Sequence, residues 1–141
     1  MIAYADSSFI VSLYSADANS ALALARVETE QPLLICSSLA SLETSNALNL
    51  RVFRNQLSET LRDSILAEIE RDIGKRVLIP RVVAEGTFEA AVRLSHKWTP
   101  QYGTRASDLL HVAIALEAGV NSFLSFDKRQ LEIARAEGLK L

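Results

Sequence analysis

Short apolar runs alternate with longer amphipathic stretches along this chain. The apolar runs predict strands at residues 2–5, 33–37, 77–80 and 122–125, with a last short strand at 139–141. Strands separated by helical stretches predict right-handed crossovers, a parallel sheet and helices on both of its faces. The expected fold class is therefore α/β: a three-layer α/β/α sandwich with a central, mainly parallel sheet of four to five strands, in one domain over residues 1–141.

Apolar residues recur at helical spacing between the predicted strands. Three helical faces follow from this spacing: Leu57, Leu61, Ile65, Ile69 and Ile73; Phe88, Ala91, Val92, Ser95 and Trp98; and Leu109, Val112, Ala113 and Leu116. Gly119 is expected to end the last of these helices. Residues 99–103, which include a proline and a glycine, form the only segment with the composition of a loop.

Composition narrows the classes of protein that fit this pattern. Hydrophobic residues make up 49% of the chain and aromatic residues 6%, so the core is expected to consist of aliphatic side chains. The formal net charge of −2 is untypical of a strongly basic nucleic-acid binder. The single cysteine, Cys36, lies in an apolar run and is expected to be a buried thiol, which fits a reducing compartment. Because no signal peptide and no membrane-spanning run is found, we expect a cytoplasmic protein.

Four acidic residues carry the chemical signal, since each stands where a predicted strand ends or a helix begins. Asp6 follows the first strand and Asp127 lies just past the fourth. Glu43 opens the helix after the second strand, and Asp108 opens the helix that leads into the fourth. A parallel topology brings all four to the carboxyl edge of the sheet. No lysine or arginine in the sequence obviously neutralises such a group, and a divalent cation is its simplest counterion.

Each acid also has an ordinary structural explanation. Asp6 could cap the helix that begins at Ser8, and Asp108 could complement a helix dipole. His111 lies one turn after Asp108 on nearly the same helical face. A catalytic or supporting role beside the acids stays open, but a partly buried histidine bonded to the backbone is the favoured expectation. The occurrence of all four acids at one predicted edge favours a site over four separate caps.

The four acids lie in four sequence blocks, YADSS at 4–8, SLETSN at 41–46, SDLLHVAIA at 107–115 and FLSFDKRQ at 123–130. These blocks resemble the PIN-domain ribonucleases, and among them the VapC-like toxins of type II toxin–antitoxin pairs. The tail ARAEGL at 134–139 also resembles the end of this family. The resemblance covers the whole chain, and it implies a PIN-like fold and a metal-dependent endoribonuclease that hydrolyses RNA phosphodiester bonds.

The resemblance assigns catalytic roles to the acidic quartet, here Asp6, Glu43, Asp108 and Asp127. In the family these acids hold Mg²⁺ or Mn²⁺, which activates a water for attack on RNA. Asp6 and Asp108 are the implied direct ligands, Asp127 binds a second ion or acts through water, and Glu43 orients the nucleophile. Carboxylate oxygens are the ligands that such hard cations prefer.

Further residues are expected around the acids. Ser7 and Ser125 are expected to support them through hydrogen bonds, and Tyr102, Arg105 and Arg129 are candidate RNA contacts. The resemblance also implies RNA as substrate, an antitoxin protein as partner and a homodimer, with no membrane association. Two alternatives stay open: a non-catalytic PIN-like scaffold that binds RNA or a partner, and a phospho-receiver signalling domain. The latter fits poorly, because no acid follows the third predicted strand.

Overall fold

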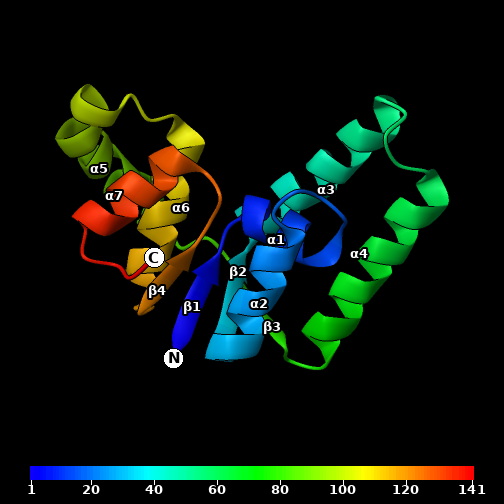
Figure 1. The fold of residues 1–141 in the computed structure, drawn as a ribbon. Coiled ribbons are helices and arrows are strands. Elements are labelled where there is room, and N and C mark those ends of the chain that lie inside the picture. Colours follow the sequence, from blue (N-terminus) through cyan, green and yellow to red (C-terminus); the bar gives the residue numbers. More distant parts are fainter.

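The computed structural model describes all 141 residues, which form four strands and seven helices (Figure 1). The strands are β1 (Ile2–Ala5), β2 (Leu33–Ser37), β3 (Leu78–Arg81) and β4 (Ser122–Leu124). The helices are α1 (Ser7–Tyr14), α2 (Ser20–Glu30), α3 (Ser38–Phe53), α4 (Glu59–Gly74), α5 (Thr87–Tyr102), α6 (Ala106–Glu117) and α7 (Lys128–Ala136). None of the helices has the length and apolar character needed to cross a membrane.

The four strands form one parallel sheet in the order β3-β2-β1-β4. This confirms the predicted parallel sheet, with β1 and β2 at the predicted residues. The predicted fifth strand is wrong, because Lys140 forms only one isolated bridge, to Ser122. The N–H of Leu139 instead bonds the carbonyl of Ala134 and closes the turn after α7, so little of the tail is left to pair with the sheet.

Side chains of the strands alternate between two apolar layers, as expected when both faces of a sheet are covered. Tyr4 and Phe123 pack in the layer with α5, α6 and α7, whereas Ala5, Cys36 and Leu124 pack in the layer with α1 and α2. Figure 1 shows α5 to α7 on one side of the sheet and α1 to α4 on the other. The three-layer prediction and the buried thiol of Cys36 are therefore confirmed.

Helix α5 differs from the prediction at its end, because residues 99–102 are helical and not a loop. Pro100 lies in the last turn of this helix, where its missing N–H removes only one bond from the ladder. The helix then ends at Gly103, which has a left-handed backbone with φ of 59° and donates its N–H to the carbonyl of Thr99 at 2.8 Å. The glycine, and not the proline, is the stop signal here.

The predicted apolar faces are only partly buried. In α5, Ala91 and Leu94 are buried, but Phe88 and Val92 are 63% and 55% exposed. The predicted stripe combined residues from two adjacent sides of the helix, and only one side faces the core. In α4, Ile65 is the only buried residue, because this outer helix lies beyond α1 and α3.

The order of the strands creates a switch point between β1 and β4. The chain adds β2 and β3 on one side of β1 and then places β4 on the other side. In open parallel sheets, ligands bind outside the carboxyl ends of the strands at such a point. Asp6 and Asp127 are the first acids after β1 and β4, so the topology puts both at this position.

Candidate active site

All four candidate acids lie at the carboxyl edge of the sheet, each on a different helix or cap. Asp6 is the N-cap of α1 and Asp127 is the N-cap of α7. Glu43 lies in the second turn of α3, and Asp108 lies in the first turn of α6. The structural explanation by capping is thus real for these residues, and what distinguishes them is the set of further contacts that each carboxylate makes.

Asp6 is a fully buried carboxylate without a cationic partner. Its Oδ1 accepts hydrogen bonds from the N–H of Phe9 at 2.9 Å and from the hydroxyl of Ser8 at 2.7 Å. Its Oδ2 accepts a hydrogen bond from the hydroxyl of Ser125 at 2.7 Å. Burial raises the pKa of Asp6, and these hydrogen bonds lower it without offsetting the burial. Burial therefore disfavours the ionised form of Asp6, and a nearby cation would stabilise it.

Ser125 connects Asp6 to Asp127 through two hydrogen bonds. The Ser125 oxygen accepts the N–H of Asp127 at 2.9 Å while its hydroxyl donates to Asp6. The Oδ1 of Asp127 accepts the N–H of Arg129 at 2.8 Å and so caps α7. The Oδ2 of Asp127 points to a different partner, the guanidinium of Arg105, at 2.8 Å.

Arg105 joins Asp108 to Asp127. Its Nε and Nη2 each lie 3.2 Å from an oxygen of Asp108, and the same Nη2 contacts Asp127. Asp108 also accepts the backbone N–H of Arg105 at 2.9 Å. The side chain of Arg105 is 59% exposed, whereas that of Asp108 is fully buried. The inference that no lysine or arginine neutralises the acids is therefore wrong for these two, because the sequence does not reveal that Arg105 folds back over both.

Glu43 is held by hydroxyl and imidazole donors. Its Oε2 lies 2.7 Å from the hydroxyl of Ser7 and 2.6 Å from Nε2 of His111. Partial burial acts to raise the pKa of Glu43, but the hydrogen bonds from His111 and Ser7 outweigh it and hold this pKa below the usual range. His111 is fully buried and bonded to side chains, so the expectation of a partly buried histidine bonded to the backbone is wrong.

Behind His111, a line of polar groups crosses the layer between the sheet and α6. Nδ1 of His111 lies 2.7 Å from the hydroxyl of Tyr4, which lies 2.7 Å from the hydroxyl of Ser37. The oxygen of Ser37 accepts the N–H of Ala40 at 3.0 Å and caps α3. Burial is the main cause of a strongly raised pKa of Tyr4, so its phenol stays protonated.

The chemistry of these residues fits a hard divalent cation, although the acids are not arranged around a common point. No group of three or more His, Cys, Asp or Glu side chains converges as metal ligands. The buried Oε1 of Gln130 has no hydrogen-bond donor, while its Nε2 lies 3.4 Å from Asp108. This unpaired oxygen and the cation-free Asp6 fit an ion and its waters. The fit requires that Arg105 leave the two carboxylates that it now joins.

The candidate RNA contacts are divided by the fold. Arg105 and Arg129 both lie beside Asp127, and the Arg129 side chain is exposed and makes no ion pair. Tyr102 is partly buried and packs against Trp98, with ring centroids 5.7 Å apart. The structure thus places the guanidinium of Arg105 and the backbone of Arg129 at the acidic edge, and it uses Tyr102 in packing.

Three further residues near the acids, Tyr4, His111 and Gln130, are related to them by their spacing in the sequence. Tyr4 precedes Asp6 by two residues, the spacing that puts two side chains on one face of a strand. His111 follows Asp108 by three residues, the spacing of one helical face. Gln130 follows Asp127 at the same interval. These spacings predict a shared face, but they do not name the partner across the sheet.

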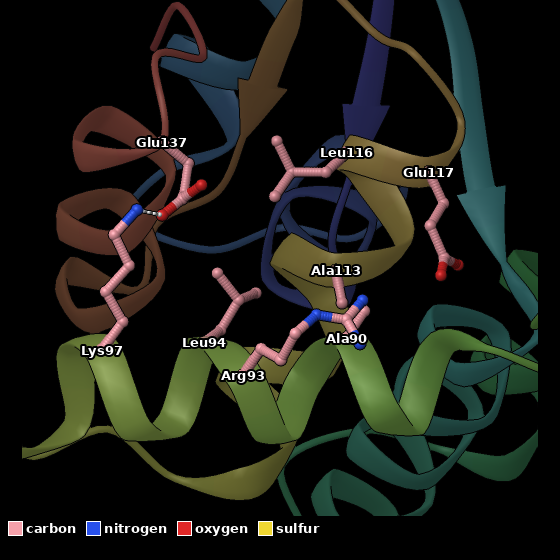
Figure 2. Close-up of a pocket in the computed structure, with 8 residues that line it drawn as sticks. All are labelled: Ala90, Arg93, Leu94, Lys97, Ala113, Leu116, Glu117 and Glu137. Carbon is pink, nitrogen blue, oxygen red and sulfur yellow. Dashed lines mark hydrogen bonds and ion pairs between the residues drawn. The ribbon is translucent and has the colours of Figure 1, made fainter.

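A cavity of about 400 Å³ between α5, α6 and α7 is separate from the acidic edge (Figure 2). Its charged lining residues are Arg93, Lys97, Glu117 and Glu137, and Lys97 forms an ion pair with Glu137 at 2.7 Å. It contains none of the four candidate acids. Its opposite charges balance one another, so it offers no excess charge to an ionic ligand.

Comparisons with known proteins bear on the family and the fold of this chain. The family model described as PIN domain matches residues 3–136. Among solved structures, VapC20 of Mycobacterium tuberculosis, a sarcin–ricin-loop-cleaving toxin, has a TM-score of 0.72 at 20% identity, covering 97% of this chain and 95% of that one. The protein PAE2754 of Pyrobaculum aerophilum has a TM-score of 0.60 at 15% identity, covering 94% and 79%. A search of curated protein sequences found no significant match. At these identities the two structures establish the shared fold.

Proposed function

The chain belongs to the PIN-domain family, and on this premise we propose that it is a metal-dependent endoribonuclease that hydrolyses RNA phosphodiester bonds. PIN domains are generally nucleases. The observation that carries the proposal is the position of four carboxylates, from four different elements, at the carboxyl edge of a matched PIN domain. The family match also argues against the phospho-receiver alternative.

Asp6, Asp108 and Asp127 would hold Mg²⁺ or Mn²⁺ at this edge. When bound, the ion would supply a water of lowered pKa and positive charge for the phosphorane-like transition state. The chain's own residues prepare this position. Ser125 orients Asp6, and Asp6 is a buried carboxylate that gains most from a neighbouring positive charge. Glu43, with a lowered pKa, stays ionised at neutral pH and accepts a proton or hydrogen bond from a water or an RNA hydroxyl.

Arg105 has a second role in this proposal. It is held by two carboxylates and is more than half exposed, so a competing cation can replace it there. Once released, its guanidinium lies next to the site where a phosphate would bind, and a guanidinium binds phosphate in a two-pronged manner. Arg129, free of ion pairs, is the second candidate contact for the RNA backbone.

We further propose that this nuclease is the toxin of a toxin–antitoxin pair and acts on RNA in the cytoplasm. The sequence resemblance to VapC-like toxins supports this, as does the shared fold with VapC20 over nearly the whole of both chains. The proposed partners are an antitoxin and a second copy of this chain. Asp108 and Asp127 already accept one guanidinium, which supports inhibition by a basic side chain of the antitoxin at the same position.

One observation favours a second candidate, the non-catalytic PIN-like scaffold. Arg105 neutralises two of the four acids, and a permanently neutralised site would bind RNA or a partner without cleaving. The two functions differ in one measurable property. A catalytic site must bind a divalent ion in competition with Arg105, and a scaffold has no need to do so.

The test is cleavage of labelled total and structured RNAs by purified protein with Mn²⁺, Mg²⁺ or EDTA. The Asp108→Asn variant, prepared in the same way, controls for contaminating nuclease. Cleavage that requires metal and is lost in the variant supports the proposal. Absence of both cleavage and calorimetric Mn²⁺ binding would favour the scaffold. Metal binding without cleavage would indicate that the RNA offered is not the substrate.

A further inference from the structure

A continuous line of hydrogen bonds leads from the N-terminus of α3 through the core to Glu43. It runs from Ala40 to Ser37, then to Tyr4, His111 and Glu43. Ser37, Tyr4 and His111 are each fully buried. Tyr4 comes from the central strand, His111 from α6 and Ser37 from the end of β2, so the line joins three elements that pack in the core. Each of these polar groups must be paired, since an unpaired buried donor or acceptor is costly.

The donors along this line can point in only one direction. The N–H of Ala40 must donate, so the Ser37 oxygen accepts it. The Ser37 hydroxyl then donates to Tyr4, and the Tyr4 hydroxyl donates to Nδ1 of His111. This leaves the proton of a neutral imidazole on Nε2, which donates to Glu43 at 2.6 Å.

The reverse direction fails at both ends. If Nδ1 of His111 carried the only ring proton, the bare Nε2 would face the ionised carboxylate of Glu43 at 2.6 Å, and two acceptors would repel one another. The Ser37 hydroxyl, receiving from both Ala40 and Tyr4, would then have a proton with no acceptor. The single direction that satisfies every group therefore fixes the tautomer of His111.

The consequence concerns the two oxygens of Glu43. His111 on α6 and Ser7 on α1 both donate a hydrogen bond to Oε2 of Glu43, and no donor bonds Oε1. The side chain of Glu43 is 29% exposed, so the carboxylate is fixed at one oxygen and reaches solvent. The oxygen left to accept from a water or substrate hydroxyl is Oε1.

We propose that Tyr4 and His111 are positioning residues that hold Glu43 by Oε2 and so present Oε1 to the reacting water. This inference rests on the proposed nuclease function for its catalytic meaning. The line of hydrogen bonds itself does not depend on that function. Both residues act through Glu43 and touch neither RNA nor metal.

The first test reads the tautomer of His111 directly. The chain has two histidines, His96 and His111, and His96 is exposed on α5. Nitrogen-15 NMR of the full chain at neutral pH, with His96→Gln used for assignment, distinguishes protonated from bare ring nitrogens. We expect His111 to show a protonated Nε2 and a bare Nδ1, while His96 shows the averaged signals of exchanging tautomers. A protonated Nδ1, or averaged signals at His111, would overturn the proposal.

The second test measures cleavage kinetics with RNA and Mn²⁺. His111→Leu removes the donor to Glu43, and we expect kcat to fall about tenfold or more with little change in KM. His111→Gln keeps an amide donor in reach of Oε2 and is expected to recover most of that loss. Tyr4→Phe leaves His111 in place but frees its tautomer, so we expect a smaller loss of kcat together with averaged NMR signals.

Tyr14→Phe is the matched control. Tyr14 also donates its hydroxyl to a partly buried carboxylate, that of Asp72, at 2.8 Å and away from the acidic edge. Tyr14→Phe removes the same kind of hydrogen bond from a tyrosine hydroxyl, and we expect kcat to stay at the wild-type value. If His111→Leu folds and cleaves like wild type, or if His111→Gln is as slow as His111→Leu, Tyr4 and His111 have no positioning role.

The two tests separate this inference from the proposed function. If wild-type protein cleaves no RNA, the proposed function fails, while the tautomer measurement still decides whether the line of hydrogen bonds exists. If wild-type protein cleaves RNA but His111 is not fixed, the nuclease stands and the positioning role fails.

Discussion

The four acids at the carboxyl edge form two pairs that are held in different ways. Asp6 and Glu43 accept hydrogen bonds from serine hydroxyls, a backbone N–H and an imidazole, and these donors are buried or, like Ser7, partly buried. Asp108 and Asp127 share one guanidinium, which reaches them from an exposed side chain. The carboxylates of Asp6 and Glu43 are thus held by neutral hydrogen-bond donors, whereas those of Asp108 and Asp127 are held by a cation that can be replaced.

This difference indicates which part of the edge can change. The buried donors to Asp6 and Glu43, such as Ser125 and His111, can leave only if the core opens. The side chain of Arg105 is more than half exposed, so water and ions can reach its contacts with the two carboxylates, although Asp108 itself is buried. We therefore expect an incoming cation, whether a metal ion or a basic side chain of a partner, to compete at Asp108 and Asp127 and not at Glu43.

The largest expected effect comes from removing one carboxylate of either pair. Asp6→Asn and Asp108→Asn should each lower metal-dependent RNA cleavage at least about hundredfold, because a ligand and its charge are lost. Circular dichroism should show an unchanged fold. The control is Asp63→Asn, since Asp63 is an exposed acid on α4. Equal activity of wild type and both site variants would remove these residues from the proposed site.

The second prediction compares the stability of the two sides. His111→Ala should lower the free energy of unfolding by about 3 kcal/mol, since it opens a cavity and leaves Tyr4 and Glu43 without their partner. Arg105→Ala should lower it by only about 1 kcal/mol, because water can reach Asp127, and the buried Asp108 keeps the backbone N–H of residue 105 and the amide of Gln130 as donors. Urea unfolding of both variants beside wild type measures the contrast. Similar losses in the two variants would contradict the division into a fixed and a replaceable side.

The third prediction concerns competition at the replaceable side. Arg105→Gln should bind Mn²⁺ about five times more tightly than wild type, because the ion no longer displaces a bound positive charge. Calorimetry measures this in the absence of RNA. Arg129→Gln is the matched control, as it removes an equal charge near Asp127 that forms no ion pair, and only a small gain is expected. A weaker affinity in Arg105→Gln would show that Arg105 supports the metal instead of competing with it.

The smallest expected effect is on stability without metal. The pKa of Asp6 is raised in the folded state, chiefly by burial, so the folded protein binds this proton more readily than the unfolded chain. Stability in EDTA should therefore be lower at neutral pH and increase as the pH falls through the raised pKa of Asp6. Asp6→Asn should be more stable than wild type by about 1 kcal/mol, or about 3 °C in Tm, at neutral pH.

That advantage should shrink toward acid pH, as wild-type Asp6 becomes neutral too. Groups with lowered pKa values, such as Glu43, cost stability only at lower pH, where they protonate, and they affect both proteins equally. Thermal melts of the two proteins across pH, in EDTA, provide the comparison. An advantage that grows as the pH falls would contradict the assignment of Asp6 as a strained, buried anion.

Several features of the fold follow from local sequence. The runs at 2–5 and 33–37 form strands at those residues because uninterrupted apolar segments suit a sheet covered on both faces. The edge to which the acids belong follows from topology, since each acid adjoins the end of a strand or the start of a returning helix. Phe88 is exposed and not buried in the predicted apolar face, because helical spacing identifies a face but does not say whether another element covers it.

The contacts between the acids depend on distant pairs and could not be predicted in the same way. The sequence places Arg105 three residues before Asp108, which is compatible with many side-chain directions, and nothing local indicates its second contact with Asp127. His111 meets Glu43 across 68 positions of the chain. Such contacts arise only when the sheet brings α3 and α6 together. Sequence periodicity can therefore indicate candidate residues, but their partners become known only from the tertiary fold.

The pairing of β1 with β4 has a consequence for the synthesis of the protein. β1, the first of the four strands along the sequence, lies beside β4, the last of the four, and Asp6 receives one of its hydrogen bonds from Ser125, 119 positions later. Domains fold when their strands have left the ribosome. The acidic edge therefore cannot assemble in a nascent chain until β4 and Asp127 have emerged, and a product that ends before them lacks both Ser125 and Asp127.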